Sequence, residues 1–281
     1  MKRLIPYVFL APALGLLLFF TAAPMLQIVY YSLLKYSFFH EHAFVGLENY
    51  RRLFSDRSFW LTFMNSIAYI GVTPVLMALS LMLALAVRSA VRGAHFFRLV
   101  YFIPVVTPIV IVGIIWRWMF AEETGIVNYL LSLVALPPVK WLSHYPTNMA
   151  SVMILTVWRG LGYYMMIFLS GLALIPKEVE EAGRIDGAGL WDQTVHIVLP
   201  MLKPTLVLIF ILSSTSAMKI FTELYIMIPG APISNKTLVA LLYRQAFERF
   251  DLGYGSAVGV VLFASTLAFS YLNIRLMERS E

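Results

Sequence analysis

Three ionisable residues, Arg159, Lys219 and Glu223, lie within long apolar stretches of this chain. A charged side chain inside a membrane-spanning helix is costly, so such residues are functional candidates by default. The polar side chains predicted near them are Tyr163, Ser213 and Ser214. Tyrosine and serine hydroxyls suit the hydroxyl groups of a sugar, and two cations beside one carboxylate equally tolerate a phosphate. The residues therefore predict a polar vestibule for a small solute and leave these two solute classes open.

The same charges also allow a purely structural interpretation. Lys219 and Glu223 are four residues apart, which places them on one face of a continuous helix, where they can pair. Arg159 can then satisfy its charge on backbone carbonyls. With spans at 149–174 and 204–227, Arg159 and Lys219 lie roughly 12–15 Å below the outer surface, at about 1.5 Å per residue. Both interpretations remain open from the sequence.

The motifs of nucleotide and metal chemistry are absent from the sequence. It has no G-x-x-x-x-G-K-[ST] and no H-E-x-x-H, its five histidines show no ligand spacing, and it has no cysteine. We therefore expect no catalytic residue, no metal site and no cofactor in this chain. An intramembrane enzyme is disfavoured because no nucleophile–base pair is evident.

A second polar feature lies between two apolar stretches, at 175–203. Pro176 suits the first turn of a helix, and the acidic residues just after it favour the positive end of the helix dipole. Val179, Ala182 and Ile185 recur at a spacing of three and form one narrow apolar stripe. The segment therefore predicts a short amphipathic helix.

A turn and a second helix are predicted to follow. Gly183, Gly187 and Gly189 permit a sharp turn and a close backbone approach. The second helix is expected over about 190–198, with Pro200 ending it before the next span. Such a helix–turn–helix buries too little apolar area to fold alone, so it must pack against the membrane bundle or another protein. The alternative is a solvated loop.

The remaining sequence predicts an all-α polytopic membrane protein. Of 281 residues, 60% are hydrophobic and 13% are charged, whereas a soluble domain carries about 25% charged residues. Crossing the hydrocarbon takes about 20 apolar residues per helix. Six spans are predicted, at about 5–34, 62–87, 99–119, 149–174, 204–227 and 255–274. Several prolines inside them predict kinks, and hence packing around a cavity rather than a plain bundle.

The orientation follows from the basic residues. Lys and Arg are denser in the connectors that share a side with both termini, including Arg88, Arg92 and Arg98. The positive-inside rule then predicts cytoplasmic termini. The first apolar run exceeds the core of about 7–15 residues of a signal peptide, so we expect a membrane helix there. The net charge of +6 does not indicate nucleic acid, because the basic residues form no long stripe.

Two smaller patterns concern helix packing. In the loop at 44–60, an ordinary connector or a short interfacial helix is expected from the spacing of Leu47, Tyr50, Leu53 and Phe54. Gly255 and Gly259 are four residues apart, which predicts close helix packing in the last span.

The 175–203 segment resembles a known motif. Its Glu181-Ala182-Gly183, Asp186-Gly187-Ala188 and Ile197-Val198-Leu199-Pro200 are similar to the EAA motif of the binding-protein-dependent ABC permeases. In that family this loop forms a coupling helix that docks in a cleft on a cytoplasmic ATPase. The resemblance implies ATPase contacts at Glu181, Ala182, Gly183, Asp186, Gly187 and Ala188. It implies structural support from Trp191, Ile197, Leu199 and Pro200. Gly183 replaces the usual second alanine at a position that requires a small residue.

Other stretches resemble the sugar-type subgroup of these permeases, which takes up maltose, other oligosaccharides and glycerol phosphate. They are 45–50, Arg92-Gly93, Phe97-Arg98, Phe102-Ile103-Pro104 and 253–257. Within the subgroup the chain looks like the first of two paired permeases. It departs from the family at 229–232, where Pro-Gly-Ala-Pro replaces a frequent Gly-Gly-Pro, which affects the expected fit to a binding protein.

The resemblance implies a single transmembrane domain over 1–281, with a core at about 62–275, in a bacterial or archaeal inner membrane. It would form half of a pathway that ATP drives by alternating access. The implied partners are a second permease subunit, a cytoplasmic ATPase dimer, an extracytoplasmic solute-binding protein and lipid. The alternative is an ion-coupled secondary transporter without an ATPase. That class needs a coupling carboxylate deep in broken helices of repeated halves, and only Glu223 lies well inside a span.

Overall fold

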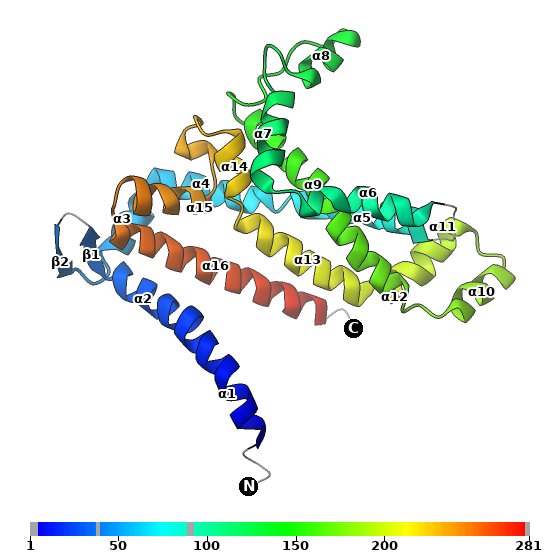
Figure 1. Ribbon diagram of the computed structural model, residues 1–281, viewed down its shortest axis with the longest axis horizontal. Coiled ribbons are helices and arrows are strands. Elements are labelled where there is room, and N and C mark those ends of the chain that lie inside the picture. Colours follow the sequence, from blue (N-terminus) through cyan, green and yellow to red (C-terminus); the bar gives the residue numbers. More distant parts are fainter. Residues whose placement is uncertain (1–4, 38–39, 89–92, 279–281) are drawn as a thin grey trace. The chain divides into compact units, whose positions relative to one another are not determined.

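The computed structural model describes residues 5–37, 40–88 and 93–278 (Figure 1). Helices dominate the described chain, and a small antiparallel hairpin interrupts them. The predicted mainly helical membrane fold is confirmed. The chain divides into two compact units. The first runs to Phe63 and includes Leu238–Leu267, and the second comprises Met64–Thr237 and the chain from Ala268 onward.

The helices agree with membrane crossing in number and length. Among the described residues, four helical stretches are long and apolar enough to span, and counting each of two bent pairs as one span gives six. The four are Phe9–Ser32, Arg57–Arg88, Thr147–Leu172 and Leu252–Arg275. The two bent pairs are Ala94–Val106 with Ile109–Met119, and Leu190–Met201 with Lys203–Met218. Six predicted spans are therefore consistent with the structure, although two of them are sharply bent.

The first unit begins with a long helix and ends with the last span. Its elements are α1 (Ile5–Leu17), the π turn η1 (Leu18–Ala22), α2 (Ala23–Ser32), β1 (Leu34–Ser37), β2 (His40–Phe44), α3 (Glu48–Ser55), α15 (Leu238–Tyr243), the π turn η4 (Arg244–Glu248) and α16 (Leu252–Glu278). Both α16 and α4 (Arg57–Tyr69) continue into the second unit. Of the two possibilities left open for 44–60, the structure has a helix, α3, whose Leu53 is fully buried.

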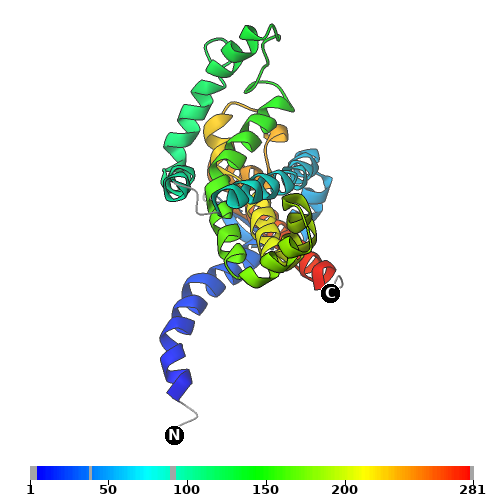
Figure 2. The same cartoon turned by 90° about the vertical axis from the view of Figure 1, so that its right-hand side faces the viewer.

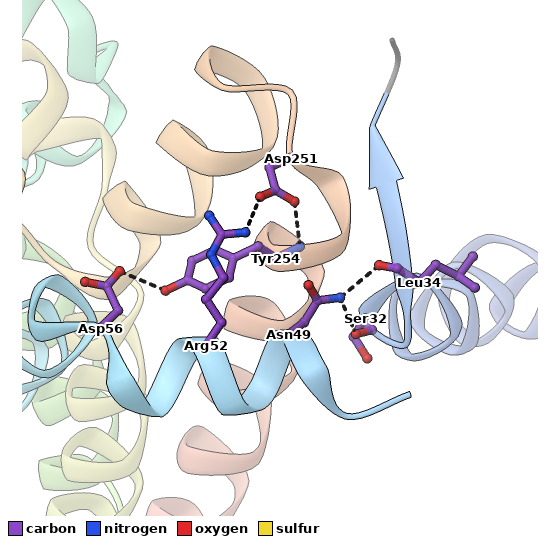
Figure 3. A network of polar contacts seen from close by, with 7 residues as sticks. All are labelled: Ser32, Leu34, Asn49, Arg52, Asp56, Asp251 and Tyr254. Carbon is purple, nitrogen blue, oxygen red and sulfur yellow. Dashed lines mark hydrogen bonds and ion pairs between the residues drawn. The ribbon is translucent and has the colours of Figure 1, made fainter. Parts of the chain in front are cut away.

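Polar contacts fasten α3 within the first unit (Figure 3). The Arg52 guanidinium lies 2.7 Å from the Asp251 carboxylate and 4.4 Å from the centre of the Tyr254 ring. The Tyr254 hydroxyl donates to Asp56 Oδ2 at 2.9 Å. Charged partners strengthen such hydrogen bonds. The start of α16 is therefore held against the C-terminal half of α3.

The close helix packing predicted at the two glycines of α16 is confirmed. A Cβ on Gly255 would lie 3.0 Å from the Ala246 Cβ, and one on Gly259 would lie 3.2 Å from Leu242 Cδ1. Both distances are tighter than ordinary van der Waals contact, so side chains there would have to displace their neighbours.

The second unit carries most of the core. Its elements are α5 (Val72–Arg88), α6 (Ala94–Val106), α7 (Ile109–Met119), α8 (Ile126–Leu133), α9 (Thr147–Leu172), α10 (Lys177–Ile185), α11 (Leu190–Gln193), the π turn η2 (Thr194–Val198), α12 (Leu199–Met201), α13 (Lys203–Met218), α14 (Thr222–Met227) and the 3₁₀ turn η3 (Ile233–Asn235). The long helix α9 is central, because α5, α6, α13 and α14 all pack against it.

The sharpest bend lies between α6 and α7, whose axes meet at 95°. In Figure 2, α6 is seen nearly end-on while α7 runs upward. Thr107 is extended, with ψ at 134°, because a following proline disfavours the helical conformation. The kink predicted from the prolines of this span is therefore confirmed at Pro108.

The fifth span ends earlier than predicted. We expected one helix over 204–227, but α13 ends at Met218 and Lys219 caps it with φ −100° and ψ 11°. Glu223 belongs to the separate helix α14. The free Ile220 carbonyl accepts a hydrogen bond from the Thr237 hydroxyl at 2.8 Å, which compensates the break. The prediction that Lys219 and Glu223 share one continuous helix is therefore wrong.

The helix after Gly189 is longer than predicted. It continues from α11 through η2 and α12 to Met201, and the chain then bends by 71° into α13. Pro200 does not end it, and lies in α12 directly after the π turn. The expected end of this helix near Val198 is therefore wrong, and the bend lies at Leu202.

Candidate functional site

A cavity of about 370 Å³ lies inside the second unit. Its volume is within the range of about 300–1,000 Å³ that small-molecule sites occupy. It is lined by Val72 and Leu76 of α5, Val105 of α6, Thr156, Arg159, Gly160, Tyr163 and Tyr164 of α9, Ser213, Ser216 and Ala217 of α13, Ile220, and Glu223 of α14. Five helices of the second unit therefore line the cavity, with both apolar and hydrogen-bonding side chains.

A charged pair forms one side of this cavity. Arg159 is near the middle of the 26-residue α9, and its Nη1 lies 3.8 Å from Glu223 Oε1. The Arg159 Nε is buried and has no hydrogen-bond partner among the described residues. Glu223 is brought there by the break after Met218, which starts a new helix beside α9. The pair is therefore close but not tightly bonded, and both of its residues line the cavity.

Five hydroxyl-bearing residues also line the cavity: Thr156, Tyr163, Tyr164, Ser213 and Ser216. Tyr163 and Tyr164 are neighbours on α9 with ring centres 5.1 Å apart. The Thr156 hydroxyl is hydrogen-bonded to Tyr69 at 2.7 Å, and Ser213 to the Thr73 hydroxyl at 3.1 Å. A hydroxyl can donate and accept at the same time, so these groups keep capacity for a further partner.

Four of the six residues predicted for the solute vestibule line this one cavity: Arg159, Tyr163, Ser213 and Glu223. The other two do not. Ser214 is fully buried and donates to the Phe210 carbonyl at 2.6 Å. Lys219 is exposed beyond the end of α13 and is not among the lining residues. The structure pairs Glu223 with Arg159, in place of the predicted Lys219.

Three polar lining residues, Thr156, Tyr164 and Ser216, are not among the six predicted. A signal for Thr156 was present in the sequence, because Thr156, Arg159 and Tyr163 follow the spacing of three and four residues that marks one helix face. Tyr164 borders the same face. A polar face on an otherwise apolar span would have identified most of the α9 contribution.

A second candidate surface is formed by α10 and α11. Its apolar side chains point outward: Ile185 is 86% exposed, Leu190 82% and Trp191 77%. The predicted stripe of α10 is exposed as well, since Val179 and Ala182 accompany Ile185 on the surface. The structural support predicted for Trp191 is therefore contradicted, because its side chain covers little of this chain.

The six residues expected to contact an ATPase differ in exposure. Glu181, Ala182, Asp186 and Gly187 are exposed, and Ala188 is half-buried. Gly183 is buried on the opposite side of α10, where a Cβ would lie 2.6 Å from Ile197 Cδ1. Its small size thus serves packing between α10 and η2, while the other five remain available on or near the surface.

The sequence of the chain matches a family model over residues 77–280. That model describes the binding-protein-dependent transport system inner membrane component. The chain belongs to this family. It is therefore an inner-membrane permease subunit of an ABC importer with several membrane-spanning helices.

The permease resembles curated relatives over nearly its whole length. It is 33% identical to the probable ABC transporter permease protein YurN of Bacillus subtilis, covering 99% of this chain and 97% of the relative. It is 30% identical to the trehalose/maltose transport system permease protein MalF of Thermococcus litoralis, covering 96% and 92%. It is 34% identical to the arabinooligosaccharides transport system permease protein AraP of Bacillus subtilis, covering 98% and 89%.

A solved structure shares the fold of the permease. It belongs to a bacterial ABC transporter that imports the acidic polysaccharide alginate, with a TM-score of 0.86 at 19% identity, covering 99% of this chain and 96% of that one. These comparisons confirm the predicted family. They argue against the two alternative functions considered from the sequence, an ion-coupled secondary transporter and an intramembrane enzyme.

Proposed function

We propose that this permease carries a sugar or a related polyhydroxylated solute, and that the cavity around Arg159 receives it. The observation that supports this most is the set of five hydroxyl-bearing residues that line the cavity beside the Arg159–Glu223 pair. Sugars present many hydroxyls that both donate and accept, and these side chains can match them. Relatives named for trehalose and maltose or for arabinooligosaccharides support the same solute class.

The charge of the cavity favours a neutral solute over a phosphate. The sequence allowed two cations beside one carboxylate, but Lys219 lies outside the lining residues and Glu223 faces Arg159. One cation and one carboxylate leave the cavity near neutrality. An anionic solute would have to compete with Glu223 for Arg159, whereas a sugar can hydrogen-bond to both partners.

The surface of α10 and α11 is proposed to dock on a cytoplasmic ATPase. It presents apolar side chains beside Glu181 and Asp186, a combination suited to a groove with a charged rim. This placement makes both termini of the permease cytoplasmic. A second permease would complete the pathway, and ATP hydrolysis would occur in the ATPase subunits. The related alginate transporter was solved with its periplasmic protein bound, which supports a binding-protein partner here.

Site-specific crosslinking tests this docking. The sequence has no cysteine, so Ala182→Cys provides a single reactive thiol on the exposed face of α10. In the assembled transporter we expect a crosslink between this thiol and the ATPase. Leu14→Cys in α1 gives a control thiol on a different helix, and it should not crosslink. Normal uptake by an Ala182→Cys transporter whose new thiol never crosslinks to the ATPase would refute the proposal.

Arg159→Ala tests the solute cavity. Removing one partner of a half-buried ion pair leaves Glu223 uncompensated and removes donors from the cavity, so uptake should fall by about tenfold or more. Initial uptake rates in reconstituted vesicles, together with the yield of assembled complex, measure this. Lys219→Ala removes a cation that lies outside the lining residues, and uptake should stay within about twofold. Normal uptake by Arg159→Ala would assign the pair a purely structural role.

A further inference from the structure

A half-buried arginine at the end of α5 joins three helices of the second unit. Arg88 is the last residue of α5, and its side chain is 26% exposed. Its Nη2 donates to the carbonyl of Leu172, the last residue of α9, at 3.3 Å. The same nitrogen forms an ion pair with Glu180 Oε1 of α10, whose side chain is 18% exposed. The two helices that pack along each other are thus both linked to α10.

The charges of this pair match the helix ends on which they lie. A cation is favourable at the C-terminal ends of α5 and α9, and a carboxylate is favourable in the first turn of α10. Because both side chains are largely withdrawn from solvent, the loss of either would leave a poorly hydrated charge without its partner. This distinguishes the pair from an exposed ion pair, which contributes little.

The inner and outer faces of α10 have different partners. Glu180 and Gly183 are three residues apart on the inner face, where they meet Arg88 and Ile197. Val179, Ala182 and Ile185 lie on the exposed face proposed to meet the ATPase. A displacement of α10 by that partner would therefore act on Arg88 through Glu180.

From Arg88, α5 leads without interruption to the cavity. The helix contributes Leu76 to the cavity wall, about 18 Å along its axis from Arg88 at 1.5 Å per residue. A Cβ on Gly160 of α9 would lie 2.9 Å from Leu76 Cδ1, so the two helices are closely packed at this level. Interiors packed at this density transmit displacement well.

We propose that the Arg88–Glu180 ion pair is a strut that transmits the movement of α10 to the cavity-lining helices α5 and α9. Arg88 is then a positioning residue for transport, although the sequence indicates it only as a cation that sets membrane orientation. The proposal rests on the proposed docking of α10 on an ATPase. It adds a specific connection by which docking alters the cavity.

The test is a charge exchange in the fully assembled transporter with its ATPase, second permease and binding protein. Arg88→Glu, Glu180→Arg and the double exchange are compared for solute molecules taken up per ATP hydrolysed. Each single variant should lower this ratio by roughly tenfold, because residues on a coupling network commonly change coupling by such factors. The double exchange should recover part of the loss, as a direct interaction between the two residues requires, while the reversed charges at the helix ends and the lost bond to Leu172 keep it below the unaltered protein.

Two further variants separate coupling from stability. Glu180→Gln keeps the shape of the side chain and removes its charge, so it should also lower the number of solute molecules taken up per ATP hydrolysed. It provides the test if the single charge exchanges fail to assemble. Arg98→Gln removes a donor to the Val87 carbonyl, at the same end of α5, while leaving the Arg88–Glu180 pair in place. It should lower the unfolding temperature and leave the ratio unchanged.

The outcomes separate the strut from the docking on which it rests. A transporter that crosslinks through Ala182→Cys, but keeps a normal ratio in Glu180→Gln and Arg88→Glu, would overturn the strut alone. Loss of the crosslink in the otherwise unaltered chain would overturn the docking first. A double exchange that assembles and crosslinks, but shows no recovery over the two single exchanges, would also overturn the strut.

Discussion

Gly162→Ala should prevent the permease from accumulating as a folded protein. A Cβ at this position would lie 2.6 Å from the carbonyl carbon of Tyr101 and 3.1 Å from the Cα of Phe102, and it would overlap the Tyr101 carbonyl oxygen. These are backbone atoms of α6, so no side-chain rotation relieves the clash. Overpacking in a tight core costs about 1–3 kcal/mol even where side chains can adjust, and here α6 would have to separate from α9.

The measurement is the fraction of monodisperse permease after detergent extraction, together with its unfolding temperature. Gly15→Ala is the matched control, because a Cβ at that helical position meets nothing within 4 Å. It should leave the yield unchanged or raise it, since alanine is favoured over glycine in helices by about 1 kcal/mol. If Gly162→Ala were as stable as Gly15→Ala, the close crossing of α6 and α9 would be refuted.

Gly187→Val should abolish uptake while the permease still inserts and folds. Gly187 has a φ of +83°, a conformation that costs an L-residue roughly 1–2 kcal/mol and that a β-branched residue adopts poorly. A Cβ there meets nothing within 4 Å, so the change does not disturb packing within the chain. The strain must instead redirect the turn between α10 and α11, which sets the shape of the proposed docking surface.

Uptake and co-purification of the ATPase, compared with the unfolding temperature, test this expectation. Gly189→Ala is the control two residues further along. Gly189 has a φ of −68°, and a Cβ there would lie 3.6 Å from Asp192 Oδ2, an ordinary contact distance. This variant should transport normally. Normal uptake by Gly187→Val, or equal loss by both variants, would show that the left-handed turn is not what the function requires.

The sequence predicts the membrane class of the fold well because hydropathy depends on composition alone. It also predicts the bend at Pro108, since a proline restricts the residue before it regardless of context. It does not predict the end of α13 at Met218. No proline or glycine marks that break, and the structure compensates it with a tertiary hydrogen bond from Thr237 to Ile220. Breaks that depend on a distant partner are not encoded locally.

The same distinction between local and distant determinants explains which residues of the cavity were predicted correctly. Arg159 and Tyr163 were found because they share one helix with a simple periodicity. Ser214 was included wrongly because adjacent residues on a helix point about 100° apart, so Ser213 lines the cavity and Ser214 does not. Lys219 was placed wrongly because its position depended on α13 continuing past Met218.

The α10–α11 segment shows a different limit. Its apolar stripe was predicted from the spacing, but the direction in which the stripe faces was not. An amphipathic helix can turn its apolar side toward its own chain or away from it, and the sequence left both open. The buried contact of Gly183 with Ile197 decides the matter, because it fixes which side of α10 faces the rest of the unit.

The π turn η2 makes the number of residues between the docking surface and α13 critical. Its closing bond runs from the Leu199 N–H to the Thr194 carbonyl, so the turn holds one residue more than an α-helical turn. Losing a single residue there would rotate everything before it by about 100° relative to α13. Every side chain of the surface would be intact and aimed in the wrong direction. Relatives that share this geometry should therefore vary very little in the length of this turn.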